Sequence, residues 1–199
     1  MLYCSFVVLG GVGLMVIDNL NLLAAALNTS PSAFFVTALS LANALGRVLA
    51  GAWSDACVQR VSRLQMLSIV ALCSSILHAT FALGSEELLY PCVLLAGLLF
   101  GASVSMVALN VVEVFGEKYV PTNFGAVDSA PIIGSYIFVT WVVSAFYQDN
   151  TTDDQGGSSC VGADCFRTAF LVNSACCAGI SVMVWTMHMV TPIQAPNKH

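Results

Sequence analysis

Charged residues are scarce in this chain of 199 residues: Asp, Glu, Lys and Arg together make up 9%, against 58% for hydrophobic residues. A soluble domain carries roughly a quarter charged residues, so this composition cannot supply a water-facing surface. The mean hydropathy of +0.85 agrees with that conclusion. The composition excludes an ordinary soluble domain and predicts an integral membrane protein with a lipid bilayer around it.

Further absences narrow the classes of function. The net charge of −5 comes with no basic patch, so nothing favours nucleic-acid binding. The three histidines, His78, His188 and His199, stand far apart and have no metal-ligand spacing. We therefore expect no metal and no other bound cofactor. The first apolar run lacks the basic start and short core of a signal peptide, and we expect it to remain in the protein.

Six apolar runs are present, each near the roughly 20 residues that a spanning helix needs. They predict an all-α membrane protein in which residues 1–199 form one bundle of six transmembrane helices. The predicted helices are Tyr3–Leu27, Ser32–Trp53, Leu64–Leu83, Leu88–Phe115, Asn123–Tyr147 and Phe166–Met189.

Basic residues in short loops indicate the orientation, because they favour the cytoplasmic side. The loops at 28–31 and 84–87 have none, and Arg167 at the start of the sixth helix can extend to the headgroups. The other basic residues of the loops and the tail lie on the opposite side. They are Arg60, Arg63, Lys118 and, on the tail 190–199, Lys198. We therefore expect both termini to lie in the cytoplasm. The membrane that holds the protein is either the plasma membrane or an endomembrane.

The long loop at 148–165 then lies on the extracytoplasmic side. It contains a glycosylation sequon at Asn150. It also contains Cys160 and Cys165, which can form a disulfide in an oxidising compartment. A solvated loop with two unpaired thiols is the alternative.

Polar side chains inside the predicted helices are candidates for contact with a substrate or a coupling proton. Asp18 and Asn21 share a face of the first helix, with Asn19 turned about 100° away. A carboxylate at this depth favours a functional site, although a hydrogen-bonded aspartate that joins two helices is an alternative. Asn43 and Asn110 fit either a polar path or interhelical hydrogen bonds.

Charged side chains from three helices reach similar depth at the predicted cytoplasmic end. Arg47 and Asp55 come from the second helix, Glu113 from the fourth and Asp128 from the fifth. Arg47 therefore has three possible acidic partners. A planar guanidinium can bridge two carboxylates at once, so it could join two helices. The pattern fits a breakable latch between helices and a permanent staple equally well.

Four stretches resemble the nodulin-like branch of the major facilitator superfamily. They are similar to its seventh helix, the end of its eighth, the turn after its tenth and the entry to its twelfth. In that order they are Val16–Leu20, Gly46–Asp55, Glu113–Lys118 through Asn123–Gly125, and Cys160–Arg167.

This resemblance covers nearly all of the chain but only the second half of the family's fold. It implies the C-terminal six-helix bundle of a secondary transporter, which moves a small solute by alternating access between two bundles. The family's cytoplasmic gating motif maps onto Gly51, Asp55, Arg60 and Arg63, with Ala56 in place of its usual basic residue. By analogy, Asp55 caps the start of a neighbouring helix.

The expected partners are therefore the small-molecule substrate and a second six-helix bundle, which is either a missing N-terminal half or another copy of this chain. A non-transporting membrane partner or scaffold, or an inactive fragment, is the main alternative. No run resembles the re-entrant filter of a channel. We expect no enzyme, because Ser103 and His188, the pair for an intramembrane serine protease, differ by about 15 Å in depth. The motifs do not distinguish a sugar, a carboxylate, a metal chelate or an amino acid as substrate.

Overall fold

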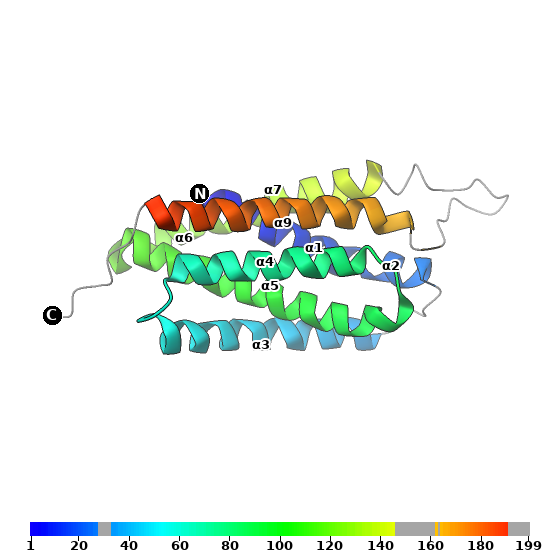
Figure 1. Ribbon diagram of the computed structural model, residues 1–199, viewed down its shortest axis with the longest axis horizontal. Helices are drawn as coiled ribbons and strands as arrows, with labels where there is room; N and C mark the ends of the chain where they lie inside the picture. Colours follow the sequence, from blue (N-terminus) through cyan, green and yellow to red (C-terminus); the bar gives the residue numbers. More distant parts are fainter. Residues whose placement is uncertain (28–32, 146–161, 163, 191–199) are drawn as a thin grey trace.

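The computed structural model describes residues 1–27, 33–145, 162 and 164–190, and these residues form helices and no strand. The helices make an antiparallel bundle (Figure 1). In chain order they are α1 (Leu2–Asp18), α2 (Leu20–Ala26), α3 (Ala33–Cys57), α4 (Arg63–Phe81), α5 (Glu86–Phe115), η1 (Glu117–Tyr119), α6 (Val120–Asp128), α7 (Ala130–Ser135), η2 (Tyr136–Val142) and α9 (Asp164–Val190).

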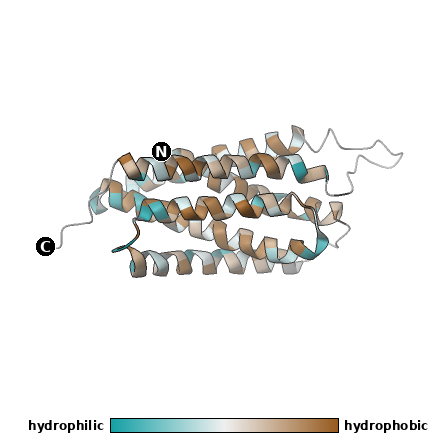
Figure 2. Cartoon of the chain, in the orientation of Figure 1, coloured by the Kyte–Doolittle hydropathy of each residue, from teal (hydrophilic) through white to brown (hydrophobic). Residues whose placement is uncertain are grey.

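Within the described residues, five helical stretches are long and apolar enough to cross a membrane, and α1 with α2 makes a sixth if this bent pair is one span. The five are Phe35–Cys57, Arg63–Phe81, Glu86–Phe115, Glu117–Ala145 and Asp164–Val190. Hydrophobic residues dominate along them, whereas hydrophilic ones gather near the turns (Figure 2). The expectation of an all-α chain with about six apolar helices is confirmed.

Successive spans run in opposite directions, so the turns fall at the two ends of the long axis (Figure 1). Met1, the α3–α4 turn and the end of α9 lie at one end, which we call the Arg63 end. The α4–α5 turn and the start of α9 lie at the other, which we call the Gly84 end. Residues before and after each turn are therefore at matching depths, as the sequence predicts.

The first predicted span is not one continuous helix. It bends by 58° between α1 and α2, at Asn19. The Asn19 side chain is buried, and its Nδ2 donates to the Met15 carbonyl oxygen at 3.1 Å. The Met15 carbonyl oxygen also accepts from the Asn19 backbone N–H at 3.2 Å, and a side chain that inserts such a second donor into the helical ladder is a physical cause of a bend.

Two other predicted boundaries change. α3 continues to Cys57, four residues beyond the predicted end, and α4 begins at Arg63 behind a capping box in which Ser62 and Gln65 bond one another's backbone N–H groups. The fifth predicted span begins at Glu117 rather than Asn123 and includes the π-helical turn η2. Pro131 lies in the first turn of α7, where its missing N–H removes no helical bond.

Glycines form the closest helix contacts, as the sequence predicts. A Cβ on Gly11 of α1 would lie 2.7 Å from the Gly134 Cα of α7, which is too close for two backbones to tolerate. On α5, a Cβ on Gly97 would reach the Leu39 carbonyl oxygen of α3 at 2.5 Å. These contacts place α1 beside α7 and α3 beside α5.

Serines hold α4 against α9 in two reciprocal pairs. The hydroxyl groups of Ser75 and Ser174 each donate to the other residue's backbone carbonyl at 2.9 Å. Ser68 and Ser181 repeat the arrangement, also at 2.9 Å. Each helix carries its two serines seven residues apart, so both pairs lie on one seam of the antiparallel helices.

Candidate functional site

A cluster of polar side chains joins three helices at the Arg63 end. Arg63, the first residue of α4, donates from Nε to Ser54 Oγ of α3 at 3.2 Å. The same Nε lies 3.9 Å from Glu113 Oε2 of α5, with exposed side-chain fractions of 21% and 16%. Arg63 therefore forms a long ion pair with Glu113, whose buried Oε2 has no hydrogen-bond partner among the described residues, and it connects α3, α4 and α5.

Asn110 extends this cluster towards the core. Its Nδ2 donates to the Arg63 carbonyl oxygen at 3.1 Å and to the Met106 carbonyl oxygen at 2.7 Å. The residue is fully buried, and its Oδ1 has no hydrogen-bond partner within the described part of the chain. Asn110 therefore fixes the start of α4 on α5, and its oxygen is left available inside the protein.

The expected latch between Arg47 and an acidic residue is not formed. Glu113 pairs with Arg63 instead. Asp55 and Asp128 are exposed. The reason is depth: because α3 extends to Cys57, Arg47 lies ten residues before its end, about 15 Å from the Arg63 end at 1.5 Å per residue.

The other residues of the predicted gate surround the same end of the bundle. Arg60 is exposed in the α3–α4 turn, and Asp55 is exposed one turn before it. A Cβ on Gly51 would meet nothing within 4 Å, so this glycine faces open space. Of the seven gate candidates, the structure brings together only Arg63 and Glu113.

Arg47 and Asn43 form a second polar position in the middle of α3. Arg47 Nε donates to Asn43 Oδ1 at 3.4 Å, one helical turn away, and the Arg47 side chain is exposed. Ser105 of α5 donates to the Arg47 carbonyl oxygen at 3.2 Å. Asn43 and Arg47 therefore share one face of α3, and the pair lies in the middle of that helix.

The polar residues of the first span are divided by the bend. Asp18 ends α1 and Asn21 lies in the first turn of α2, and both side chains are exposed on the bundle surface. Asn19 is turned inward and bonds its own helix. Asp18 and Asn21 thus remain candidates for contact with a solute, whereas Asn19 has a structural role at the bend.

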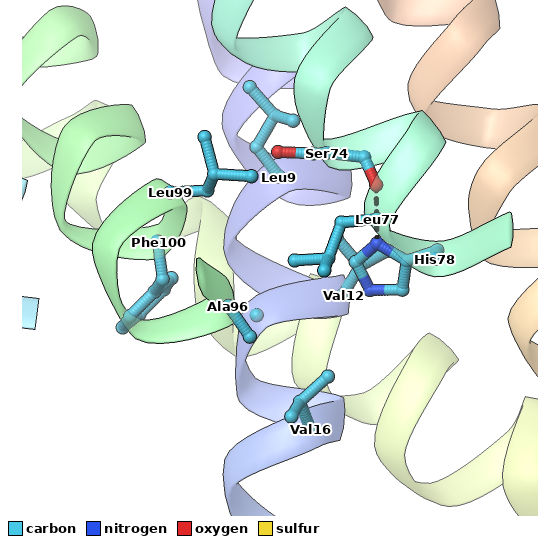
Figure 3. A pocket seen from close by; sticks show the side chains of 10 residues that line it. Leu9, Val12, Val16, Ser74, Leu77, His78, Ala96, Leu99 and Phe100 are labelled. Carbon is cyan, nitrogen blue, oxygen red and sulfur yellow. Dashed lines mark hydrogen bonds between the residues drawn. The ribbon is translucent and has the colours of Figure 1, made fainter. Parts of the chain in front are cut away.

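His78 is a buried polar residue whose environment the sequence did not indicate. Figure 3 shows its ring among apolar side chains of α1, α4 and α5, beside a cavity of about 10 Å³. Nδ1 lies 2.8 Å from the Ser74 carbonyl oxygen, and Nε2 has no hydrogen-bond partner that the described residues supply. The ring also packs on Phe170 of α9, with centroids 6.0 Å apart. The cavity is large enough for about one water molecule.

Two sequence expectations fall partly outside the described residues. Cys165 is buried and disulfide-bonded, while its expected partner Cys160 and the sequon at Asn150 lie outside them, so that pairing and glycosylation stay predictions.

The two residues considered for protease chemistry have other contacts. Ser103 donates to the Phe100 carbonyl oxygen at 2.7 Å, and His188 Nδ1 lies 3.1 Å from Ser62 Oγ.

Comparison with known proteins identifies a protein family. No curated protein and no solved structure matches the chain. Residues 1–193 match the family described as "NFD4, C-terminal domain". The match extends from α1 through the end of α9 and includes both the cluster at the Arg63 end and the pair of Arg47 and Asn43. The chain therefore belongs to the NFD4 C-terminal domain family.

Proposed function

We propose that this chain is a multi-pass membrane protein and forms one six-helix half of a secondary transporter for a small solute. In this proposal the fold is the C-terminal bundle of a major facilitator transporter, and a second bundle completes the solute path. Both termini face the cytoplasm, with Met1 and the end of α9 at the Arg63 end.

The exposure of Arg47 carries the proposal. A guanidinium in the middle of an apolar helix is expensive to place against lipid, so such residues face a bundle interior or a water-filled cavity. Arg47 lies on the outer surface of this bundle, with its backbone carbonyl bonded to Ser105 of α5. The α3 face that carries it therefore requires an aqueous cavity or another bundle next to it, as in a two-bundle transporter.

The cluster at the Arg63 end has a role that suits alternating access. Arg63, Glu113 and Ser54 link the ends of three helices through one ion pair and one hydrogen bond. Exposed Asp55 and Arg60 beside this cluster can contact a second bundle and separate from it as the cytoplasmic side closes and opens. We assign the cluster to a cytoplasmic gate.

Uptake into proteoliposomes tests the proposal. The purified chain is reconstituted, and entry of labelled glucose, alanine, succinate and inorganic phosphate is compared with entry into protein-free vesicles. We expect saturable uptake of one class. We also expect its loss in Asp18→Asn, because Asp18 is the exposed carboxylate of the bent span.

Asp164→Asn is the matched control, since Asp164 is also an exposed aspartate at a helix end but lies at the Gly84 end in an ion pair with Arg167. Its uptake should equal that of the unmodified chain. If no solute enters faster than into protein-free vesicles while the chain remains helical, transport by paired copies of this chain is wrong, and a separate second bundle or the non-transporting scaffold is favoured.

A further inference from the structure

The depth of Arg47 prevents its charge from reaching either end of its helix. Arg47 lies ten residues before Cys57 and twelve after Phe35, about 15 Å and 18 Å along the axis at 1.5 Å per residue. An arginine near a helix end can extend its head group to the interface, as Arg167 can. The guanidinium of Arg47 must instead find its anion near the middle of the span.

That anion is missing from the bundle itself. Among the described residues, ion pairs join Arg63 with Glu113 and Arg167 with Asp164, and no carboxylate lies within 4.0 Å of Arg47. Arg47 thus has its charge on the face that the proposed solute cavity borders, with no described group that neutralises it.

The hydrogen bond with Asn43 leaves a set of donors. Because Arg47 Nε donates to Asn43 Oδ1, the amide turns its oxygen towards the arginine and keeps its two Nδ2 hydrogens available. The two terminal amino groups of Arg47 are also without a described partner. A group held by both residues would therefore meet N–H donors only, in the forked geometry that fits carboxylate and phosphate.

The backbone beneath these two residues is fixed by α5. A Cβ on Gly101 would collide with the Asn43 carbonyl oxygen and would lie 3.0 Å from the Arg47 backbone nitrogen. Ser105 adds the hydrogen bond to the Arg47 carbonyl oxygen. This turn of α3 is therefore held rigidly against its neighbour, which is what a binding position needs.

We propose that Arg47 and Asn43 bind the negatively charged group of the solute, so that the substrate is a small soluble anion carrying a carboxylate or a phosphate. This inference rests on the proposed function, because the transport path brings the anion to mid-membrane depth. Arg47 binds the charge through its terminal amino groups, and Asn43 orients the guanidinium and donates a further hydrogen bond.

Binding to the purified chain in an uncharged detergent tests this assignment without requiring transport. Acetate, succinate and inorganic phosphate are titrated while thermal unfolding is followed, since a ligand that binds the folded state raises the midpoint. Succinamide, which has the shape of succinate but no charge, is the reference ligand. We expect stabilisation by at least one anion and none by succinamide.

Variants then locate the site. Arg47→Gln should weaken binding of that anion by about tenfold or more, the usual effect of losing a hydrogen bond to a charged group. Arg47→Lys should give an intermediate loss, because it keeps the charge without the fork. Arg167→Gln is the matched control, an exposed arginine near the Gly84 end, and should bind as the unmodified chain does.

The assignment is overturned if no anion stabilises the chain, if succinamide stabilises it equally, or if Arg47→Gln binds the anion unchanged. An anionic lipid, phosphatidylglycerol, added to the detergent should not compete with the bound anion; competition would assign the site to lipid headgroups. Uptake of a neutral solute that Arg47→Gln leaves intact would reject the anion site and keep the transporter. Anion binding without uptake in proteoliposomes would keep the anion site and reject transport by paired copies of this chain.

Discussion

Arg63 and Arg47 differ in what surrounds their charges. Arg63 lies at a helix end, partly buried, with Ser54 and Glu113 within reach. Arg47 is exposed in the middle of a helix with an uncharged amide as its partner. A paired charge at the end of a bundle stabilises helix packing, whereas an unpaired charge at mid-depth requires a partner from outside.

Charge reversal tests the structural role of the Arg63–Glu113 pair. Arg63→Glu and Glu113→Arg should each lower the free energy of unfolding by about 1–3 kcal/mol, between the values for exposed and for fully buried pairs. The double reversal should recover part of the loss, because the pair of opposite charges is restored. Denaturant unfolding in detergent, read as a double-mutant cycle, measures the coupling.

The exposed pair Arg167 and Asp164, 3.6 Å apart with side-chain exposed fractions of 62% and 82%, is the control. Its cycle should give a coupling of at most about 0.5 kcal/mol, because water screens it. Equal coupling in the two cycles would show that Arg63 and Glu113 do not depend on one another, and the gate assignment would lose its structural basis.

The sequence named both members of the ion pair at the Arg63 end but did not pair them with each other. Glu113 and Arg63 were both candidates, and their contact is present. The sequence left Arg47 with three possible acidic partners, and the structure pairs it with none of them; the end of the second helix was placed at Trp53, four residues before the observed end at Cys57. At 1.5 Å per residue that difference moves a side chain by about 6 Å, which is enough to exchange one cation for another.

At the scale of helices, α3 depends on one neighbour for its position. It packs mainly on α5, through backbone contacts at Gly97 and Gly101, and lies at one edge of the bundle (Figure 1). Large apolar side chains of α3, such as Val48, remain exposed. The contact with α5 therefore sets the position of Arg47 and Asn43 as well.

Gly101→Ala should disturb this contact and the polar position together. Its new methyl group would collide with the Asn43 carbonyl oxygen, which is backbone and cannot rotate away. We expect a loss of about 1–3 kcal/mol in the free energy of unfolding, as for other overpacked sites. We also expect weaker anion binding, because α3 must move away from α5. Denaturant unfolding and the succinate titration measure the two effects.

Gly179→Ala on α9 is the matched control, because a Cβ there would meet nothing within 4 Å. It should leave binding unchanged and should stabilise the helix by at most about 1 kcal/mol, since alanine loses less backbone entropy than glycine. If Gly101→Ala behaved in the same way as this control, the close approach of α3 and α5 would not be what positions Arg47.

Helix existence could be predicted from the sequence because apolar length alone decides it, and the glycine contacts could be predicted because small residues recur at helix spacing. The bend at Asn19 and the serine seam of α4 and α9 were not predicted. An asparagine side chain inside a helix can point to the surroundings or hydrogen-bond the backbone of its own helix. The sequence does not show which of these Asn19 does, and in the structure its side chain is turned inward and bonds the Met15 carbonyl oxygen. The seven-residue spacing of Ser68 and Ser75, repeated by Ser174 and Ser181, is visible in the sequence, but it indicates a contact only once the two helices are known to be neighbours.

At the scale of the whole molecule, the alternation of helix directions separates the turns into two groups. The α3–α4 turn, with Arg60, and the turn after α5, with Lys118, lie at the Arg63 end, while the α4–α5 turn with Glu86 and Glu87 lies at the Gly84 end (Figure 1). The basic residues of these turns thus lie at the Arg63 end, whereas Arg167 at the start of α9 lies near the Gly84 end. Because basic loops are retained in the cytoplasm, this distribution supports the proposal that the Arg63 end faces the cytoplasm.

Protease protection of tagged chains tests that orientation in any membrane. One version carries a short epitope between Gln59 and Arg60, and the other carries it between Gly84 and Ser85, so each tag lies in a turn at one end of the bundle. In sealed microsomes with their cytoplasmic face outward, the first tag should be digested and the second protected, because the basic α3–α4 turn stays in the cytoplasm. Detergent should make both tags accessible, which shows that the protection came from the membrane.

Digestion of both tags in sealed microsomes would mean that the two turns lie on the same side, and the helices could not then alternate across the bilayer. The reverse pattern would keep the alternation but place the Arg63 end outside, and the cluster of Arg63 and Glu113 could no longer serve as a cytoplasmic gate.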